Sequence, residues 1–275
     1  IGRQALLLNT TGGSNTVVGV NAMDANTTGS TNIAVGLNAL SKNTTADNNT
    51  AVGSNTLKEN TTGTGNVALG YGALDAATTA DNNTAVGNNS GTEITTGANN
   101  TVVGGSALDA LTTGSSNVAI GYRALTIATT SSNNTAVGND ALLLNSTGNA
   151  NTAVGSLALD ANTTGVSLVA VGYGALGANT TANQNVAVGQ NALGANTTGT
   201  LNSAVGHDAL VSNDTGSYNT AIGALALDAN TTASNATAVG YGALGSNTSG
   251  TSLAVYKQRR NGYSVDVAAG KARAF

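Results

Sequence analysis

Groups able to carry acid–base, nucleophilic or metal chemistry are few in this chain and do not converge. His207 is the only histidine and there is no cysteine, so we expect His207 to be a surface residue rather than a catalyst. Aspartates recur at one position of a repeating unit but lack the alternating spacing of a calcium loop. They are Asp24, Asp75, Asp109, Asp160 and Asp228. We therefore predict no enzymatic activity, no catalytic or metal site and no cofactor.

Aromatic side chains offer a more specific kind of chemistry, namely stacking on the sugar rings of a glycan. The candidate surface-binding residues share one position of the repeating unit and are Tyr71, Tyr122, Tyr173 and Tyr241. This position varies in residue type along the chain, as an exposed position should. The four tyrosines are three or four units apart, so the sequence does not predict one continuous aromatic platform.

The element that must position these side chains is a unit marked by a glycine at every seventeenth residue. We call this residue the ladder glycine. Its series has no insertion or deletion and comprises Gly2, Gly19, Gly36, Gly53, Gly70, Gly87, Gly104, Gly121, Gly138, Gly155, Gly172, Gly189, Gly206, Gly223 and Gly240. A fixed period of this length is the signature of a solenoid, in which each unit packs mainly on its neighbours.

The consensus of the unit is Asn-Thr-Ala-Val-Gly-x-x-Ala-Leu-x-x-Asn-Thr-Thr-Gly-x-x. Helix is disfavoured because β-branched residues, Asn and Gly dominate, while Glu, Lys, Gln and Arg are scarce. We predict short strands on both sides of the ladder glycine and a turn at Asn-Thr-Thr-Gly. The predicted fold is all-β, a parallel β-solenoid or β-roll of about fifteen 17-residue coils over residues 1–252.

Alternation along the predicted strands places apolar residues on both faces of each strand. A larger aliphatic such as Val52 precedes the ladder glycine and an alanine such as Ala51 precedes the aliphatic, while a pair such as Ala39-Leu40 follows the glycine. Because successive strand side chains point to opposite faces, one member of each pair fills the coil and the other needs a cover. We expect identical chains to supply that cover side by side, as a homotrimer.

Asparagine occupies two recurring positions that have a structural and a functional interpretation. One Asn stands four residues before most ladder glycines, and stacked amides can hydrogen-bond along a solenoid axis. A second Asn begins the turn, where segments such as Asn9-Thr10-Thr11 match the N-glycosylation acceptor pattern. We favour the structural role, because recurrence at the turn explains these residues without sugar.

One part of the array departs from the consensus. After Gly87 the segment from Asn88 to Ile94 lacks the Ala-Leu pair, so the core there must thin or repack. Apolar residues replace the turn Asn in four successive units, at Ala77, Ile94, Leu111 and Ala128. This side of residues 77–128 could be a binding patch, a subunit contact or neutral drift.

Composition narrows the possible partners. Only 8% of the residues are charged and the pI is near 4.7, which argues against nucleic-acid binding. No apolar run approaches the roughly 20 residues that span a bilayer, so we expect no direct membrane insertion by this segment. The chain begins inside a repeat, and we expect it to be a piece of a longer protein.

The pattern changes after Gly250, and residues 253–275 form a basic cap or neck segment. It contains a majority of the nine Lys and Arg residues, namely Lys257, Arg259, Arg260, Lys271 and Arg273. The alternating segment Tyr263-Ser264-Val265-Asp266-Val267 predicts a last strand, and we expect it to cap the open end of the solenoid. A basic nucleic-acid arm is the rival interpretation, for which these charges are weak support.

The Asn-Thr-Ala-Val-Gly motif, in exact or variant form at residues 15–19 through 236–240, resembles the head repeat of trimeric autotransporter adhesins and related phage or bacterial tail-fibre proteins. The segment 260–270 resembles the neck that follows such heads. The resemblance implies a left-handed parallel β-roll three chains wide, extracellular on a cell surface or virion fibre, that attaches to a host glycan or protein. The Asn-Thr-Thr-Gly turn and the seventeen-residue unit are closer to the tail-fibre versions.

The predicted function is therefore a structural and binding fibre segment that mediates or projects attachment to a cell surface. Ice binding is the alternative, motivated by two threonine columns that begin at Thr10 and Thr11, only one of which can line a given strand face. A polysaccharide-degrading enzyme on the same fold is a third possibility, but the array lacks clustered carboxylates.

Overall fold

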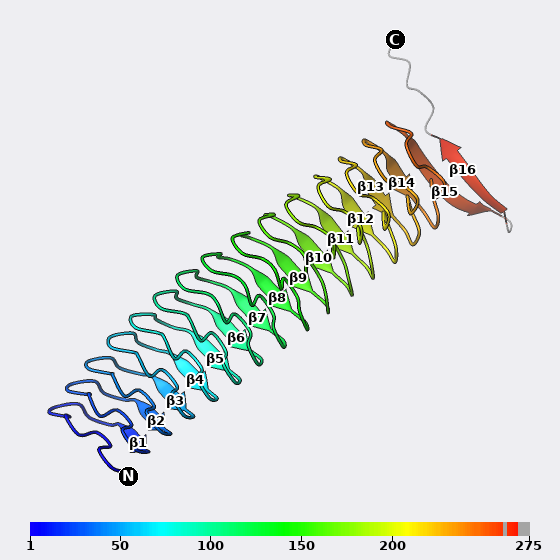
Figure 1. Ribbon diagram of the computed structural model, residues 1–275. Coiled ribbons are helices and arrows are strands. Elements are labelled where there is room, and N and C mark those ends of the chain that lie inside the picture. Colours follow the sequence, from blue (N-terminus) through cyan, green and yellow to red (C-terminus); the bar gives the residue numbers. More distant parts are fainter. Residues whose placement is uncertain (261–262, 269–275) are drawn as a thin grey trace. The chain divides into compact units, whose positions relative to one another are not determined.

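A computed structural model describes residues 1–260 and 263–268 of the chain. The chain divides into two compact units, residues 1–140 and residues 141–275, and each unit is described by itself. All regular elements among the described residues are β-strands (Figure 1). That part of the chain contains no helix with the length and apolar character needed to cross a membrane.

The first unit contains eight strands of three residues each. They are β1 (Thr16–Val18), β2 (Ile33–Val35), β3 (Thr50–Val52), β4 (Val67–Leu69), β5 (Thr84–Val86), β6 (Thr101–Val103), β7 (Val118–Ile120) and β8 (Thr135–Val137). Neighbours pair in parallel, and the register advances by one repeat per strand, so that Val17 pairs with Ala34 and Ala34 with Ala51. Each repeat is therefore one coil of a parallel β-solenoid, as the sequence predicts.

The second unit continues the same pattern and ends differently. Its strands are β9 (Thr152–Val154), β10 (Val169–Val171), β11 (Val186–Val188), β12 (Ser203–Val205), β13 (Thr220–Ile222), β14 (Thr237–Val239), β15 (Ala254–Arg260) and β16 (Tyr263–Ala268). Strands β9 to β15 pair in parallel, whereas β16 pairs antiparallel with β15.

The C-terminal strand that the sequence predicts at residues 263–267 is thus present as β16, in a hairpin with β15. Its role as a cap stays a prediction. The predicted neck also includes residues 261–262 and 269–270, which lie outside the described residues, as do Lys271 and Arg273.

The prediction of a strand on each side of the ladder glycine is wrong, because each coil has one strand and the Ala-Leu segment forms turns. The cause is the left-handed backbone at the leucine, where φ is 52° at Leu40 and 51° at Leu74. With alternation interrupted, both members of the pair can point inward, and Ala39 and Leu40 are both fully buried. A left-handed leucine costs about 1–2 kcal/mol, which burial of the side chain offsets at about 2 kcal/mol.

The strand itself does follow the alternation that the sequence predicts. Its central alanine is fully buried in the coil, as at Ala51 and Ala85 in the first unit. The larger aliphatic before the ladder glycine points outward, and Leu69 is 47% exposed. The small residue therefore fills the narrow interior and the large residue lies on the surface.

Buried amide ladders hold the coils of each unit together. The Asn32 side chain donates from Nδ2 to the carbonyl oxygen of Ala46 at 2.8 Å and accepts at Oδ1 from the backbone N–H of Asn49 at 2.9 Å. At the turn, Asn43 donates to Oδ1 of Asn26 at 2.8 Å. Asn26, Asn32 and Asn43 are fully buried, so the folded coil hides the turn residues Asn26 and Asn43 from a modifying enzyme, whereas Asn9 in the first coil is half-buried.

The turn ladder breaks at Ala77, and this leaves the buried Oδ1 of Asn60 without a hydrogen-bond partner. We expect Ala77→Asn to supply the missing donor, but Ile94 in the next coil has no side-chain donor, so the unpaired acceptor moves to residue 77 and the free energy of unfolding should change by less than about 0.5 kcal/mol. The variant Ala77→Asp has nearly the same shape but no N–H, and it should lower stability because it buries an unpaired carboxylate. Urea titrations followed by circular dichroism would measure both changes, and equal stabilities of the two variants would contradict the ladder argument.

Candidate binding surface

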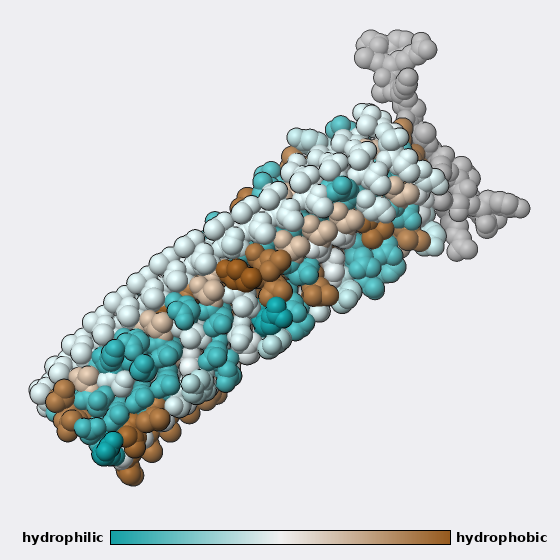
Figure 2. All heavy atoms as spheres, in the orientation of Figure 1, coloured by the Kyte–Doolittle hydropathy of each residue, from teal (hydrophilic) through white to brown (hydrophobic). Residues whose placement is uncertain are grey.

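Two columns of side chains make the outer face of the sheet in each unit. They come from the first and third residue of every strand, with exposed aliphatic groups at Val18, Ile33, Val67, Leu69, Val103 and Ile120 in the first unit. Exposed aliphatics recur in the second unit at Val154, Val171, Val205 and Ile222. One face of the molecule shows hydrophobic patches between pale and hydrophilic areas (Figure 2).

The four tyrosines that the sequence singles out are all exposed. Tyr71 and Tyr122 lie in the first unit with exposed fractions of 55% and 58%, and Tyr173 and Tyr241 lie in the second unit. Each directly follows a ladder glycine and lies in the turn after its strand. Within the first unit three coils separate Tyr71 from Tyr122, and within the second unit four coils separate Tyr173 from Tyr241.

Two further tyrosines are exposed at positions that the sequence analysis did not select. Tyr218 belongs to the bend before a strand, and Tyr256 is the third residue of β15. The sequence did not indicate that Tyr218 and Tyr256 are exposed, because neither occupies the recurring position after the ladder glycine.

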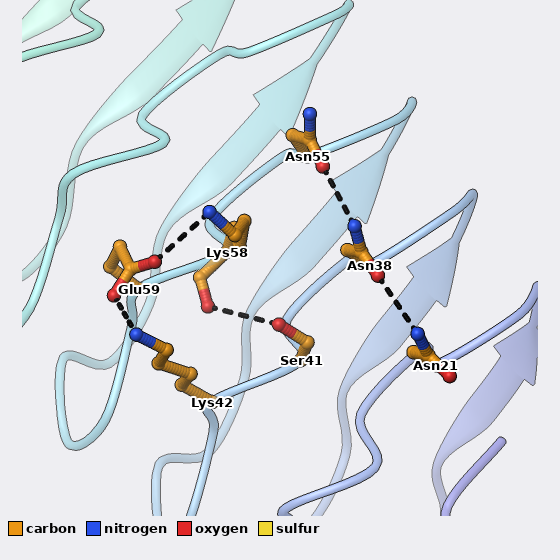
Figure 3. A network of polar contacts seen from close by, with 7 residues as sticks. All are labelled: Asn21, Asn38, Ser41, Lys42, Asn55, Lys58 and Glu59. Atoms are coloured by element: carbon orange, nitrogen blue, oxygen red, sulfur yellow. Dashed lines mark hydrogen bonds and ion pairs between the residues drawn. The ribbon is translucent and has the colours of Figure 1, made fainter. Parts of the chain in front are cut away.

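A charged cluster on two successive coils of the first unit was also not predicted from the sequence (Figure 3). The Lys42 ammonium pairs with Glu59, and the Lys58 ammonium lies 3.2 Å from the other Glu59 oxygen. The hydrogen bond from Lys42 lowers the pKa of the Glu59 carboxyl, and the hydrogen bond to Glu59 raises the pKa of Lys58. The sequence spacing could have predicted this ion pair, because Lys42 and Glu59 are seventeen residues apart and therefore lie on neighbouring coils.

Beside this cluster, an amide ladder runs along the coil surface (Figure 3). Asn21 donates to Oδ1 of Asn38 at 3.3 Å, and Asn38 donates to Oδ1 of Asn55 at 3.1 Å. These residues stand two positions after the ladder glycine and have positive φ, which Asn tolerates better than most residues. The ladder therefore stabilises a strained corner of each coil.

The pKa of the Asp75 carboxyl is shifted in the direction opposite to that of Glu59. Burial raises the pKa of Asp75, and its Oδ1 has no hydrogen-bond partner. A raised folded pKa means that Asp75 favours folding when protonated and that stability declines as the pH rises past the ordinary aspartate pKa.

We therefore expect Asp75→Asn to stabilise the protein by about 0.5 kcal/mol at neutral pH, after allowance for solvent screening, and to have little effect near pH 3.

Glu59→Gln should instead destabilise the protein at neutral pH and have little effect at low pH. Its lowered pKa contributes stability above the ordinary glutamate pKa that disappears as the pH falls. Chemical denaturation at pH 3 and pH 7 tests both, and a destabilised Asp75→Asn at pH 7 would contradict the assignment.

The departing coils do not form a surface patch, so the binding-patch and subunit-contact interpretations of Ala77, Ile94, Leu111 and Ala128 are wrong. All four side chains are fully buried. Gly91 stands where other coils have leucine, and a Cβ on Gly91 would lie 2.9 Å from Cδ1 of Ile94. Ile94 therefore fills the space of the missing leucine, and the core repacks without thinning.

Apart from the charged cluster around Glu59, the candidate catalytic and metal-binding groups named from the sequence do not come together in the part of the chain that the structure describes. His207 is exposed beside Asp208, with 3.2 Å between Nδ1 and a carboxylate oxygen. Among residues 1–260 and 263–268, no three His, Cys, Asp or Glu side chains gather closely enough to hold a metal ion. The structure thus offers exposed columns rather than a convergent cluster as its candidate site.

By its fold, the chain belongs to the class of all-β repeat proteins with parallel β-solenoid coils. Comparison of the chain with models of protein families, with curated proteins and with solved structures finds no match.

Proposed function

We propose that the chain is a structural and binding segment of an extracellular fibre, an adhesin or a phage tail fibre. Copies associate side by side as a homotrimer that mediates or projects attachment to a cell surface. Regular coils carry the same exposed position many times, so weak contacts to a cell-surface glycan or protein add up through avidity.

The outward aliphatic column is the observation that supports this proposal most. In the first unit, Ala85 is buried while its neighbour Val86 faces outward, and the same arrangement recurs in coil after coil. Monomeric proteins avoid contiguous exposed apolar surface of this kind. Association of identical chains along this face would remove the aliphatic side chains from water.

Light scattering on the purified chain tests the association, with circular dichroism on the same sample. We expect a β-rich trimer. Val86→Lys with Val103→Lys should yield a monomer that keeps its β spectrum, because lysines charge the proposed contact. The matched control replaces Thr79 and Thr96, which are exposed in the turns of nearby coils, by lysine and should stay trimeric. A monomeric wild-type chain would overturn the proposed assembly.

Attachment is tested separately with fluorescent protein on a panel of bacterial and animal cells. The wild-type trimer should bind at least one cell type more tightly than the lysine monomer, by about a hundredfold if two or more chains engage together. Equal binding of trimer and monomer would contradict the avidity argument.

Ice binding receives less support from the geometry. The Thr27 hydroxyl donates to the carbonyl oxygen of Thr44 at 3.0 Å, and the Thr44 hydroxyl donates likewise to Thr61 at 3.1 Å, so this column bonds along the solenoid. Both threonine columns lie in bends rather than on a strand face. A measurement of thermal hysteresis tests this alternative, and we expect none.

A further inference from the structure

Four successive coils of the first unit align the residue that follows the ladder glycine. These residues are Tyr71, Asn88, Gly105 and Tyr122. Backbone hydrogen bonds fix their register, because the carbonyl oxygens of Tyr71, Asn88 and Gly105 each accept an N–H from the next coil, at 2.8, 3.1 and 3.1 Å. We call this set the Tyr71–Tyr122 column.

The column presents two aromatic rings with a polar and an open position between them. Tyr71 and Tyr122 are more than half exposed, and Asn88 is exposed as well. Gly105 has no side chain, and a Cβ there would meet Cδ2 of Tyr122 at 3.7 Å. The Tyr122 ring therefore lies close to the Gly105 backbone, on the side of the coil that precedes it.

Spacing decides what kind of ligand could use both rings. Parallel coils are about 4.8 Å apart, so three steps separate the backbone positions of the two tyrosines by roughly 14 Å. An extended β-linked polysaccharide advances by a similar length for each sugar. A chain laid along the column would place one sugar beside each coil and bring its first and fourth sugars to the two tyrosines.

Charge at the column favours a neutral ligand. The Cζ atom of Arg123 lies 6.0 Å from the centroid of the Tyr122 ring, over one face of it, but the Nε atom of Arg123 lies 3.5 Å from a carboxylate oxygen of Asp140. The guanidinium is thus balanced by a carboxylate within the same unit. Asn88 offers amide hydrogen bonds to hydroxyl groups without adding charge.

We propose that the Tyr71–Tyr122 column binds a neutral linear polysaccharide parallel to the solenoid axis, with a sugar ring stacked on each tyrosine. This inference rests on the proposed attachment function, to which it adds the class of ligand and its direction. The column lies in the turns after the strands, beyond the outer strand face proposed as the subunit contact.

Titration calorimetry with chito- and cello-oligosaccharides of two to six sugars tests the inference on the full chain. Affinity should rise at least about tenfold between three and five sugars for one of the two series, because only the longer oligosaccharides reach both rings. Tyr71→Ala and Tyr122→Ala should each abolish this step while the β spectrum is retained. Tyr218→Ala is the matched control, because Tyr218 is equally exposed at another position of the coil.

Absence of binding by the wild type, or a length step that survives both alanine variants, would overturn the inference. The cell assay separates this failure from failure of the proposed function. Attachment without oligosaccharide binding refutes the polysaccharide site alone. Tyrosine-dependent oligosaccharide binding with no attachment to any cell type refutes the attachment function and leaves the site standing.

Discussion

Replacement of Gly104 by alanine is expected to destabilise the first unit by about 3 kcal/mol or more. The φ angle of Gly104 is 137°, a backbone conformation that residues with a Cβ rarely adopt. The added Cβ would also lie 2.4 Å from the carbonyl oxygen of Gly121 in the next coil. Relief would require the two coils to separate, and separation would break the backbone bonds between them.

The adjacent residue supplies the control for this experiment. Gly105→Ala adds the same atom, but the nearest heavy atom is Cδ2 of Tyr122 at an ordinary contact distance of 3.7 Å. We expect a change of less than about 0.5 kcal/mol for Gly105→Ala. Urea denaturation followed by circular dichroism compares the two, and similar stabilities for both variants would refute a steric requirement at the ladder position.

The same requirement explains why the glycine period is never broken before the C-terminal segment. At Gly19, Gly36 and Gly70 a Cβ would lie between 2.1 and 2.3 Å from the carbonyl oxygen of the next ladder glycine. Each glycine thus permits its own coil to approach the next, and one side chain anywhere in the series would interrupt the stack.

The repeat made much of this architecture predictable from the sequence. A seventeen-residue period without insertions demands one coil per repeat, and the observed register, with Ala34 opposite Ala51, follows it. The structural role of the Asn columns was predictable too, since a recurring amide in a stacked coil meets its own copy in the next coil.

The conformation after the ladder glycine was not predictable from residue type. Leucine disfavours the left-handed backbone conformation, so the residue types of the Ala-Leu pair predict a strand in which Ala39 and Leu40 point to opposite faces. Tertiary packing overrides that preference, because the tight corner needs positive φ and the interior needs the leucine side chain. Strand alternation would have placed one residue of each Ala-Leu pair on the surface, whereas both residues are buried.

For the candidate surface, the sequence identified the position but not its geometry. Variability after the ladder glycine indicated exposure, and Tyr71 and Tyr122 are exposed. The open position at Gly105 between them depends on where the Tyr122 ring lies, and residue type alone does not determine that. The Lys42–Glu59 pair was not predicted, because these residues are seventeen positions apart in the sequence and meet only when successive coils stack.

The exchange between Gly91 and Ile94 predicts a strong energetic coupling inside the first unit. Gly91→Leu alone should cost about 2 kcal/mol, because the new side chain would collide with Cδ1 of Ile94 and approach Cδ2 of Leu74, which is 3.3 Å from a Cβ built at Gly91. Ile94→Asn alone should cost about 3 kcal/mol, because it removes a fully buried aliphatic side chain and leaves space beside Gly91.

The double variant restores the consensus arrangement of leucine and turn asparagine. Its leucine would fill the space that Ile94 vacates. Its asparagine could donate to the carbonyl of residue 97, as Asn60 donates to Gly63 at 3.0 Å. We expect the double variant to be at least about 2 kcal/mol more stable than the sum of the single changes predicts. Urea denaturation of the four proteins measures this coupling, and additive costs would mean that the two side chains do not share one space.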